Sequence, residues 1–495
     1  MWASSFCAPG PSAFLLSQRD PPACDTIWRM VDGPHHVPPH LLQAVAEQTG
    51  RIALVVGAGC SLESPTSLEL SDEYARQVHA QLVVEHVLDS GDCANPNDLS
   101  AVTSAVWSKV ESQEPVVTRL PRGAFRDAQA NDGYLTAAAL LREGSVSAVL
   151  TLNFDLAMSD ALGQLSANDE VAVIASPAAV GDLGSRVLVY LHRNANEDNF
   201  DEWTLRVESL TDEWKGRWEE VLSQRVLSSP VVVFAGLGSP AAVLTESITW
   251  IRSCIEPGHH HTYVVDPAAT TSFQTALELP DDAHIRMGWC EFMAHLDDRL
   301  SDHLRTALEE SCRELCTSHS WDNEAASISS VCDAFYKRGL VASGKQRARW
   351  LLHKRSYLSD SEHIRGFIAY LLLGIGLVQR QPGTDVTVRH DGVVELLREN
   401  RVVGSCLPVS GEGTHHWTAI EPRVKAVLKK MEAHEIPSAI LIAGLQGPAP
   451  SEITPPEDVG CSVVDGDIIG GDMSPLHITV DELRADPTLA ARVVV

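Results

Sequence analysis

The sequence predicts an α/β protein whose first half is built on a parallel β-sheet. Five apolar runs of strand length occur in this half, helical stretches separate them, and each run ends in polar or glycine residues. Continuous apolar strands are typical of parallel sheets covered by helices on both faces. The runs with their polar ends are 52–61, 147–155, 186–192, 229–239 and 262–267. Because ligands bind beyond the carboxyl ends of such strands, the sequence predicts a binding site at that edge.

Length and pattern indicate more than one domain. A chain of 495 residues is long for a single domain, so we expect two or three. Residues 1–36 are rich in proline and are expected to be loosely structured. The parallel-sheet domain is expected over 37–295, and a mainly helical module over 296–383. The strand pattern returns over 384–495, which predicts a small C-terminal α/β domain.

Composition narrows the class of protein. The formal net charge of -28 argues against a general nucleic-acid surface, which must neutralise phosphates. Eleven cysteines without regular spacing do not indicate a disulfide framework. The N-terminus lacks the basic start and long apolar run of a secretory signal, and no run reaches the roughly 20 apolar residues of a membrane span. We therefore expect a cytoplasmic protein with no membrane contact.

The first strand leads directly into a glycine-rich turn. Gly57-Ala58-Gly59-Cys60-Ser61 follows the apolar run 52–56, and a helix is expected from about Leu68. Glycines let a backbone approach a pyrophosphate, and turn and helix amides supply donors without added charge. The usual dinucleotide fingerprint has a third glycine, and Leu62 stands there instead. The turn predicts a phosphate cradle in a Rossmann-like domain; a tight turn without a ligand is the alternative.

Four motifs in order resemble those of a known family. They are GAGCS at 57–61, TLNFD at 151–155, the LH of VYLHRN at 191–192, and VVFAGLGSP at 232–240. The set resembles the sirtuin-like superfamily, in particular the bacterial sirtuin-like NAD hydrolases of antiphage defence. The resemblance extends from about residue 41 to about Asp266. It implies that NAD is the substrate.

The resemblance also assigns roles to individual residues. Asn153 and His192 would be the catalytic pair. Asp155 would help shape the nicotinamide pocket. The residues that would bind the rest of NAD, through its pyrophosphate and riboses, are Gly57, Ala58, Gly59, Ser61, Gly236, Gly238, Ser239 and Asp266.

Two departures from the family pattern bear on the activity. Arg193 follows the histidine, where the family usually has glycine. Its side chain would narrow the entrance of the pocket or change the charge there. Protein-deacylating members generally carry a CxxC…CxxC zinc module after this histidine. No cysteine occurs here between Cys93 and Cys254, and a structural zinc site needs four ligands. We therefore expect no zinc, and the absence favours the NAD-cleaving branch over a deacylase.

The residue types suit cleavage of the bond between nicotinamide and ribose. That cleavage builds oxocarbenium character on the sugar, as in glycoside hydrolysis. Asn153 can position a water or a ribose hydroxyl without carrying charge. A neutral His192 can take the proton, since an unperturbed histidine has a pKa of about 6.5. The alternatives are that His192 is a structural residue and that Asn153 and Asp155 cap a helix.

Other reactive residues carry weaker signals. His259-His260-His261 invites a metal-site interpretation, but adjacent side chains on an extended segment point in different directions. Cys312 and Cys316 share a helix face without a partner pair, and Cys60 is expected to be a small buried residue. No metal site is predicted.

The C-terminal half offers two further hypotheses. A basic cluster over 345–355 predicts either a solvated helix face or contact with a nucleic acid, an acidic partner or another subunit. The β-β-α-β order after Thr384 resembles restriction-endonuclease-like folds. The Glu-x-Lys expected on the second strand is replaced by Ser405-Cys406-Leu407, so metal-dependent DNA cleavage is not expected. A degenerate nuclease fold used for sensing, a domain that binds a partner or a small ligand, and an oligomerisation domain are the alternatives. Residues 448–472 are expected to form a long loop.

Two function classes remain open at this stage. The favoured one is an NAD glycohydrolase that depletes NAD in antiphage defence by abortive infection. Such an effector would be a homo-oligomer, held inactive until a partner protein, a phage component or a nucleic acid acts through the C-terminal regions. The alternatives are a non-catalytic NAD or ADP-ribose sensor and a zinc-free protein deacylase.

Overall fold

A seven-stranded parallel sheet organises the first half of the chain. The computed structural model describes residues 36–238, 242–256, 258–268, 271–318, 328–351, 362–380, 383–415, 417–445 and 475–494. The strand order is β3-β4-β2-β1-β5-β6-β7, and every neighbouring pair is parallel. The strands are β1 Ile52–Val56, β2 Val146–Thr151, β3 Ala172–Ile174, β4 Val187–Tyr190, β5 Val231–Ala235, β6 His261–Val265 and β7 His284–Ile285. The predicted Rossmann-like parallel sheet is confirmed, and β3 and β7 are additions to it.

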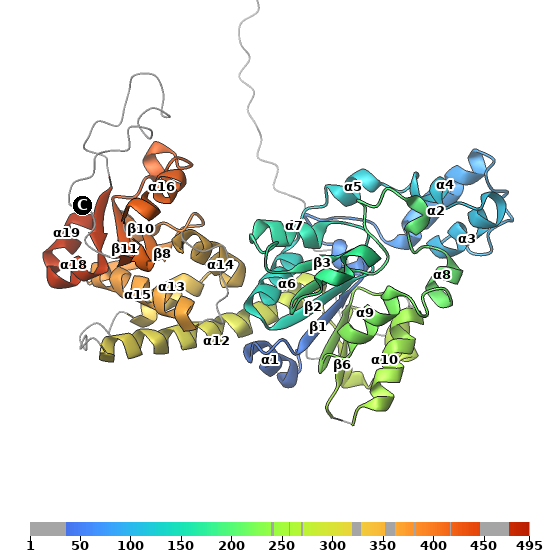
Figure 1. Cartoon of the computed structure of the whole chain (residues 1–495), viewed down its shortest axis with the longest axis horizontal. Helices are drawn as coiled ribbons and strands as arrows, with labels where there is room; N and C mark the ends of the chain where they lie inside the picture. The colour runs from blue at the N-terminus through green and yellow to red at the C-terminus, as the bar shows by residue number, and fades with distance from the viewer. Residues whose placement is uncertain are drawn as a thin grey trace, which may run out of the picture. The chain divides into compact units, whose positions relative to one another are not determined.

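Helices cover both faces of this sheet (Figure 1). Alternate residues of β1 face opposite cores: Leu54 packs with α6 and α7, and Val55 packs with α9 and α10. All five residues of β1 are buried, which is why its sequence is apolar throughout. The helices of this half are α1 Pro39–Ala46, α2 Ser71–Val84, α3 Leu99–Val110, α4 Glu114–Val117, α5 Arg122–Arg126, α6 Asp132–Glu143, α7 Ala157–Gln164, α8 Val207–Thr211, α9 Trp218–Leu227, α10 Ala242–Cys254 and α11 Ser272–Ala276.

A separate small core lies outside the sheet. The helices α2 to α5 are inserted between the first glycine turn and α6. Their apolar residues pack with Trp203 and Leu205, which belong to the long connection between β4 and β5. This connection is the part of the chain in which the sequence analysis noted the missing zinc module.

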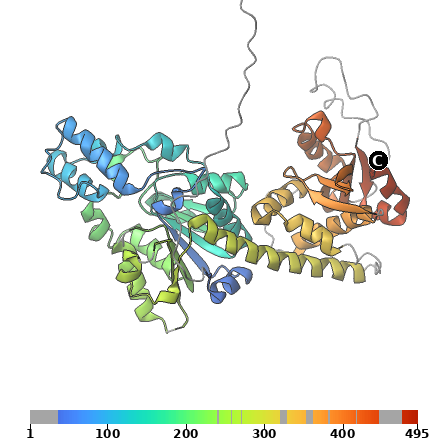
Figure 2. The ribbon, with the colours of Figure 1, turned by 180° about the vertical axis from the view of Figure 1, so that it is seen from behind.

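Four helices link the two sheets, as the sequence predicts. They are α12 Trp289–Ser318, α13 Ile328–Tyr336, α14 Gly339–Trp350 and α15 Glu362–Gln379. The apolar side of α12 contacts α6 and α1 near its start and α13 and α15 further along. Figure 2 brings this long helix to the front. Among the described residues, no helix is long and apolar enough to cross a membrane.

The C-terminal part is a smaller mixed sheet, which confirms the predicted α/β pattern. Its strand order is β12-β11-β10-β9-β8; the pairs among β8, β9 and β10 are antiparallel, and those among β10, β11 and β12 are parallel. The strands are β8 Thr384–Val388, β9 Val394–Arg398, β10 Arg401–His415, β11 Ala439–Leu445 and β12 Leu476–Thr479; the helices are α16 Trp417–Leu428, α18 Val480–Ala485 and α19 Ala490–Val493. The predicted long loop over 448–472 lies outside the described residues.

Candidate active site

The glycine turns after β1 and β5 pack directly against each other. The amide of Gly57 donates to the carbonyl of Ala235 (2.9 Å), and that of Gly59 donates to the carbonyl of Gly236 (2.9 Å). A Cβ at Gly57 would lie 2.6 Å from the Gly236 carbonyl oxygen, and one at Gly59 would lie 2.7 Å from the Gly236 Cα. Gly236 has a φ of +65°, which side chains rarely adopt. These three glycines are therefore required by backbone contact between the turns, with or without a ligand.

A buried polar network lies beside the first turn. Ser61 ends the short 3-10 helix Ala58–Ser61, and its Oγ donates to Oδ2 of Asp155 (2.8 Å). The same Oγ lies 2.8 Å from the hydroxyl of Tyr134, which comes from the first turn of α6. Burial raises the pKa of Asp155, and the hydrogen bond from Ser61 opposes that rise. The network thus joins the β1 turn, α6 and the segment after β2.

Asn153 is held by this network through its amide nitrogen. Its Nδ2 lies 3.0 Å from the carbonyl oxygen of Gly57, 3.1 Å from Oγ of Ser61 and 3.1 Å from the hydroxyl of Tyr134. Its backbone amide donates to Oγ1 of Thr151 (3.0 Å). Within the described part of the chain, Oδ1 of Asn153 has no hydrogen-bond partner. An acceptor on the other side of a fixed amide is thus left for a ligand.

His192 follows the neighbouring strand. The register pairs Thr151 of β2 with Tyr190 of β4, and the amide of Leu191 donates to the carbonyl of Thr151 (3.0 Å). Asn153 and His192 therefore each stand two residues beyond a paired position on adjacent strands. This arrangement brings the two predicted catalytic residues to the same edge of the sheet.

The imidazole of His192 is buried and neutral. Burial lowers the pKa of His192 to about 4; the nearby Arg193 also lowers it, while a hydrogen bond to the backbone carbonyl of Leu152 raises it. Nε2 is buried without a partner among the described residues. In the neutral tautomer that carries its proton on Nδ1, the lone pair lies on Nε2. In that tautomer Nε2 can accept a proton.

Aromatic side chains surround this histidine. The ring of Phe154 lies 6.4 Å from that of His192 and stacks on Trp203 at 4.8 Å. Trp203 is 1% exposed and belongs to the core of the helical insertion. These apolar surroundings account for the desolvation that lowers the pKa of His192.

Arg193 adopts the backbone conformation for which glycine is favoured. Its φ is +74°, in the left-handed region. Its side chain is buried, forms ion pairs with Glu202 (3.0 Å) and Glu219 (3.6 Å), and lies over the ring of Trp218. The two carboxylates engage the guanidinium and hold it among α9 and the β4–β5 connection. Arg193 still lowers the pKa of the adjacent histidine.

The remaining predicted contacts lie along the same edge but outside the network. Gly238 is exposed, and its carbonyl accepts from Oγ of Ser272 (2.9 Å). Oδ1 of Asp266 accepts from the amide of Ala268 (2.8 Å). Ser239 lies outside the described residues. Hydrogen bonds thus join Ser61, Asn153 and Asp155, but none links Asp266 or Gly238 to them in the described part of the chain.

Sequence reasoning missed Tyr134. This residue is 1% exposed and bonds two predicted site residues, although it precedes Asn153 by 19 positions. Asn131 caps α6 by accepting from the amide of Tyr134 (3.1 Å) and donates to the carbonyl of Cys60 (2.8 Å). An Asn-Asp pair before an apolar periodic segment is a helix-start signal. It could have located the helix, but not the direction of the tyrosine.

The cysteines and clustered histidines have structural contacts. Nε2 of His260 lies 2.9 Å from the carbonyl oxygen of Leu227, and Nε2 of His261 lies 3.1 Å from that of Gly258. Cys60 is fully buried, and burial raises the pKa of its thiol far above the usual range. Contact with the Cys332 thiol and burial raise the pKa of Cys312. Among the described residues, no group of histidines, cysteines and carboxylates could hold a metal ion.

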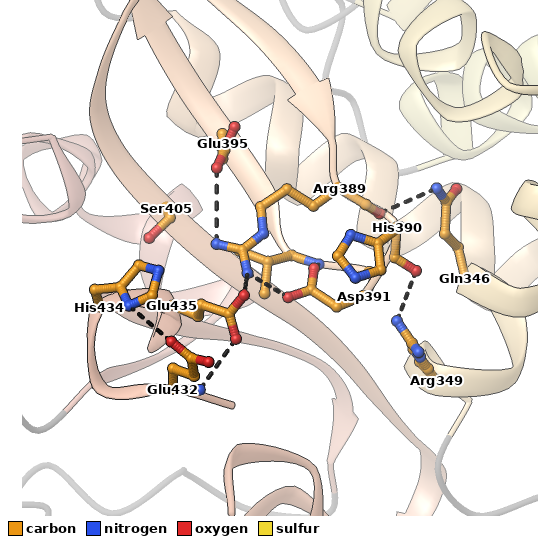
Figure 3. A network of polar contacts seen from close by, with 12 residues as sticks. Gln346, Arg349, Arg389, His390, Asp391, Glu395, Ser405, Glu432, His434 and Glu435 are labelled. Carbon is orange, nitrogen blue, oxygen red and sulfur yellow. Dashed lines mark hydrogen bonds and ion pairs between the residues drawn. The ribbon is translucent and has the colours of Figure 1, made fainter. Parts of the chain in front are cut away.

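The second sheet carries a polar network of a different kind (Figure 3). The guanidinium of Arg389 pairs with Asp391, Glu395 (3.7 Å) and Glu435 (3.5 Å). Three carboxylates thus surround an internal cation. Ser405 lies near this group, and its amide and hydroxyl bond to Ser438. One guanidinium faces three carboxylates here, so this network carries an excess of negative charge.

The basic cluster is only partly solvated. Arg347 is buried and pairs with Glu143, and Nη1 of Arg349 donates to the carbonyl of His390 (2.6 Å). Nζ of Lys345 donates to Oε1 of Gln164 (3.5 Å). His353, Lys354 and Arg355 lie outside the described part. The described basic residues thus do not form the predicted solvated face, because at least two of them bind other elements of the chain.

Comparison with known proteins yields structural likenesses alone. No family model matches the sequence, and no curated protein matches it. A solved Sir2 homologue–NAD complex shares 17% identity with a TM-score of 0.32; the match covers 54% of this chain and 96% of that one. A Sir2–p53 peptide–NAD+ complex shares 13% identity with a TM-score of 0.32, and covers 52% of this chain and 95% of that one. We therefore take the function from the contacts of this chain.

Proposed function

We propose that the protein is an NAD glycohydrolase that cleaves NAD to nicotinamide and ADP-ribose. The observation that carries the proposal is the unpartnered, buried Nε2 of a neutral His192, on the strand next to the one that presents Asn153. A buried histidine whose pKa is strongly shifted, at the edge of a parallel sheet where ligands bind, is a candidate catalytic residue. The motif resemblance supports NAD as the substrate.

The remaining predicted residues would hold the rest of the substrate. Ala58 and Ser61 lie in the turn after β1, where helix and turn amides suit a pyrophosphate. Gly238, Ser239 and Asp266 follow β5 and β6, the next two strands, and would contact ribose and phosphate groups. The amides of Gly57 and Gly59 already donate within the protein, so these glycines would contribute shape more than donors.

The chemistry assigned to the side chains is simple. A water molecule forms a bond to the anomeric carbon of the ribose while the bond from that carbon to nicotinamide breaks. Oδ1 of Asn153 accepts a hydrogen bond and orients the water or a ribose hydroxyl. Nε2 of His192 takes the proton and passes it to solvent. Nicotinamide leaves as a neutral molecule, so no acid is needed for its departure.

The burial of Nε2 supports a regulated enzyme. Water has to reach this atom for hydrolysis, so a change of conformation must first uncover it. A gate of this kind fits an effector of antiphage defence, because unrestrained loss of NAD would kill the cell. We propose that a partner protein, a phage component, a nucleic acid or self-association, acting in the cytoplasm through the C-terminal regions, provides the trigger.

Nicotinamide release tests the proposed function. The intact chain is incubated with NAD, alone and with infected-cell lysate or single-stranded DNA, and products are separated by chromatography. We expect equal amounts of nicotinamide and ADP-ribose, and at least about a hundredfold lower rate for Asn153→Ala. An Asn153→Ala variant that folds and cleaves NAD at the wild-type rate would exclude the assignment. Stoichiometric NAD binding without cleavage under every condition would indicate a sensor instead.

A further inference from the structure

We propose that Tyr134 is a positioning residue that fixes the orientation of the Asn153 amide, an inference that rests on the proposed function. The Tyr134 hydroxyl lies 3.1 Å from Nδ2 of Asn153 and 2.8 Å from Oγ of Ser61. It touches no reacting atom in the scheme above. Its role is to decide which end of the amide faces the substrate.

The single carboxylate of the network, Asp155, determines which hydroxyl donates and which accepts in each hydrogen bond. Both oxygens of Asp155 accept hydrogen bonds, Oδ2 from Oγ of Ser61 (2.8 Å) and Oδ1 from the amide of Ala157 (3.1 Å), and such bonds favour the ionised carboxylate. Because the one proton of the Ser61 hydroxyl is donated to Asp155, the oxygen of Ser61 must accept from the Tyr134 hydroxyl. Burial raises the pKa of Tyr134 far above its usual value, so the phenol keeps that proton.

The direction of these hydrogen bonds also determines the orientation of the Asn153 amide. With its proton given to Ser61, the oxygen of Tyr134 can accept from Nδ2 but cannot donate to an amide carbonyl. The carbonyl oxygen of Gly57 also accepts from Nδ2 (3.0 Å). Oγ of Ser61, whose proton goes to Asp155, is a third acceptor at 3.1 Å, so a flipped amide would place Oδ1 against three acceptors. The chain from Asp155 through Ser61 to Tyr134 therefore keeps Oδ1 on the substrate side.

The position of the Tyr134 ring is fixed independently of Asn153. Trp289, at the start of α12, lies edge-on to it with centroids 6.0 Å apart. A Cβ at the preceding Gly133 would lie 2.2 Å from the Trp289 indole nitrogen, so the two helices are in close contact here. Asn131 holds the Tyr134 amide at 3.1 Å. The hydroxyl is thus preorganised, as positioning requires.

Tyr134→Phe tests the role, with Tyr190→Phe as its matched control. Both tyrosines are buried, and both hydroxyls lie 2.8 Å from a serine Oγ. The partner of Tyr190 is Ser159 of α7, outside the Asn153 network. We expect Tyr134→Phe to lower kcat by about tenfold or more with KM changed less than about threefold, as the loss of one oriented hydrogen bond implies. Tyr190→Phe should leave kcat within about twofold of the wild type.

A second readout does not depend on catalysis. In protein labelled with 15N at asparagine, the side-chain amide signal of Asn153, assigned by its loss in Asn153→Ala, should exchange slowly with solvent. Tyr134→Phe should speed this exchange at least about tenfold, and Tyr190→Phe should not. With an active wild type, equal kcat in the two phenylalanine variants would overturn the proposal, and equal exchange would overturn it in every case. If the wild type cleaves no NAD but Tyr134→Phe alone speeds the exchange, the positioning role stands and the proposed function fails.

Discussion

At His192 the surroundings, more than any single neighbouring charge, determine the protonation state. Burial is the largest influence and lowers the pKa to about 4, with Arg193 adding to it. The folded-state pKa is therefore below the value of about 6.5 in the unfolded chain. This difference stabilises the fold above pH 6.5, and that stabilisation is lost as the pH falls toward 4. It also keeps the proposed base neutral across the physiological range.

The pH profile of NAD cleavage should reflect this shift. Because a base with a pKa of about 4 stays neutral, we expect kcat/KM to be constant within about twofold between pH 8 and pH 5.5. A histidine with the ordinary pKa of about 6.5 would lose about tenfold by pH 5.5. The check is initial-rate kinetics with circular dichroism at each pH, so that unfolding is not mistaken for protonation. An acid limb centred near pH 6.5 would contradict the burial-controlled pKa.

Sequence reasoning succeeded for residues that follow strands. Asn153 and His192 come after apolar runs, and parallel pairing carries both to one edge without further information. Tyr134 could not be found in this way, since its direction depends on how α6 packs on Trp289. The conformation of Arg193 was also inaccessible, because its φ of +74° leaves no sequence pattern and its ion-pair partners, Glu202 and Glu219, come from later segments.

Among the elements, α6 joins the site to the rest of the first half. Its first turn carries Tyr134, and its last carries Arg142 and Glu143. Its start contacts the first turn of α12 so closely that Gly133 has no space for a side chain. Any displacement of α6 at this contact would move the Tyr134 hydroxyl relative to Asn153.

Gly133→Ala should therefore destabilise the protein. A Cβ there would lie 2.2 Å from the Trp289 indole, and the overpacking should cost about 1–3 kcal/mol of the free energy of unfolding. Gly123→Ala is the matched control, because Gly123 is also helical and has nothing within 4 Å of the added Cβ. It should be neutral or slightly stabilising. The measurement is urea unfolding followed by tryptophan fluorescence, and equal midpoints for the two variants would refute the close contact.

The longer strands of the first sheet could be predicted from the sequence, but its two short strands could not. Each of the five longer strands contains at least three consecutive apolar residues, so its sequence alone marks it. In contrast, β3 Ala172–Ile174 and β7 His284–Ile285 are too short to leave a periodic pattern. They are strands because β4 and β6 offer them edges to pair with.

At the scale of the molecule, α14 contacts α6, which packs on the first sheet, and the turn between β8 and β9 of the second sheet. Nε1 of Trp350 donates to the carbonyl of Gly392 (2.7 Å) in the turn between β8 and β9. On its other side, Arg347 pairs with Glu143 of α6, and both are buried. Burial, followed by the charge of Arg142, lowers the pKa of Arg347 to about 9. No local pattern in the sequence marks this pair, because its members are 204 positions apart.

Removing one member of the buried pair should be costly. Glu143→Gln leaves Arg347 buried without a carboxylate, and we expect a loss of about 3–5 kcal/mol in the free energy of unfolding. The control is Glu85→Gln at the more exposed pair with Arg119, for which the loss should stay below about 1 kcal/mol. Both variants are compared by chemical denaturation. Similar losses in the two would mean that the contact between α14 and α6 contributes no more than a surface ion pair.

The most direct test of the account is NAD cleavage by His192→Ala beside the wild type, each triggered in the same way. Both proteins are first shown to bind NAD by calorimetry, and nicotinamide is then measured over time. We expect wild-type protein to release nicotinamide and His192→Ala to bind NAD but release it at least about a hundredfold more slowly. Equal rates in the two proteins would contradict the assignment of His192 as the base, and failure of the wild type to bind NAD would exclude NAD as the substrate.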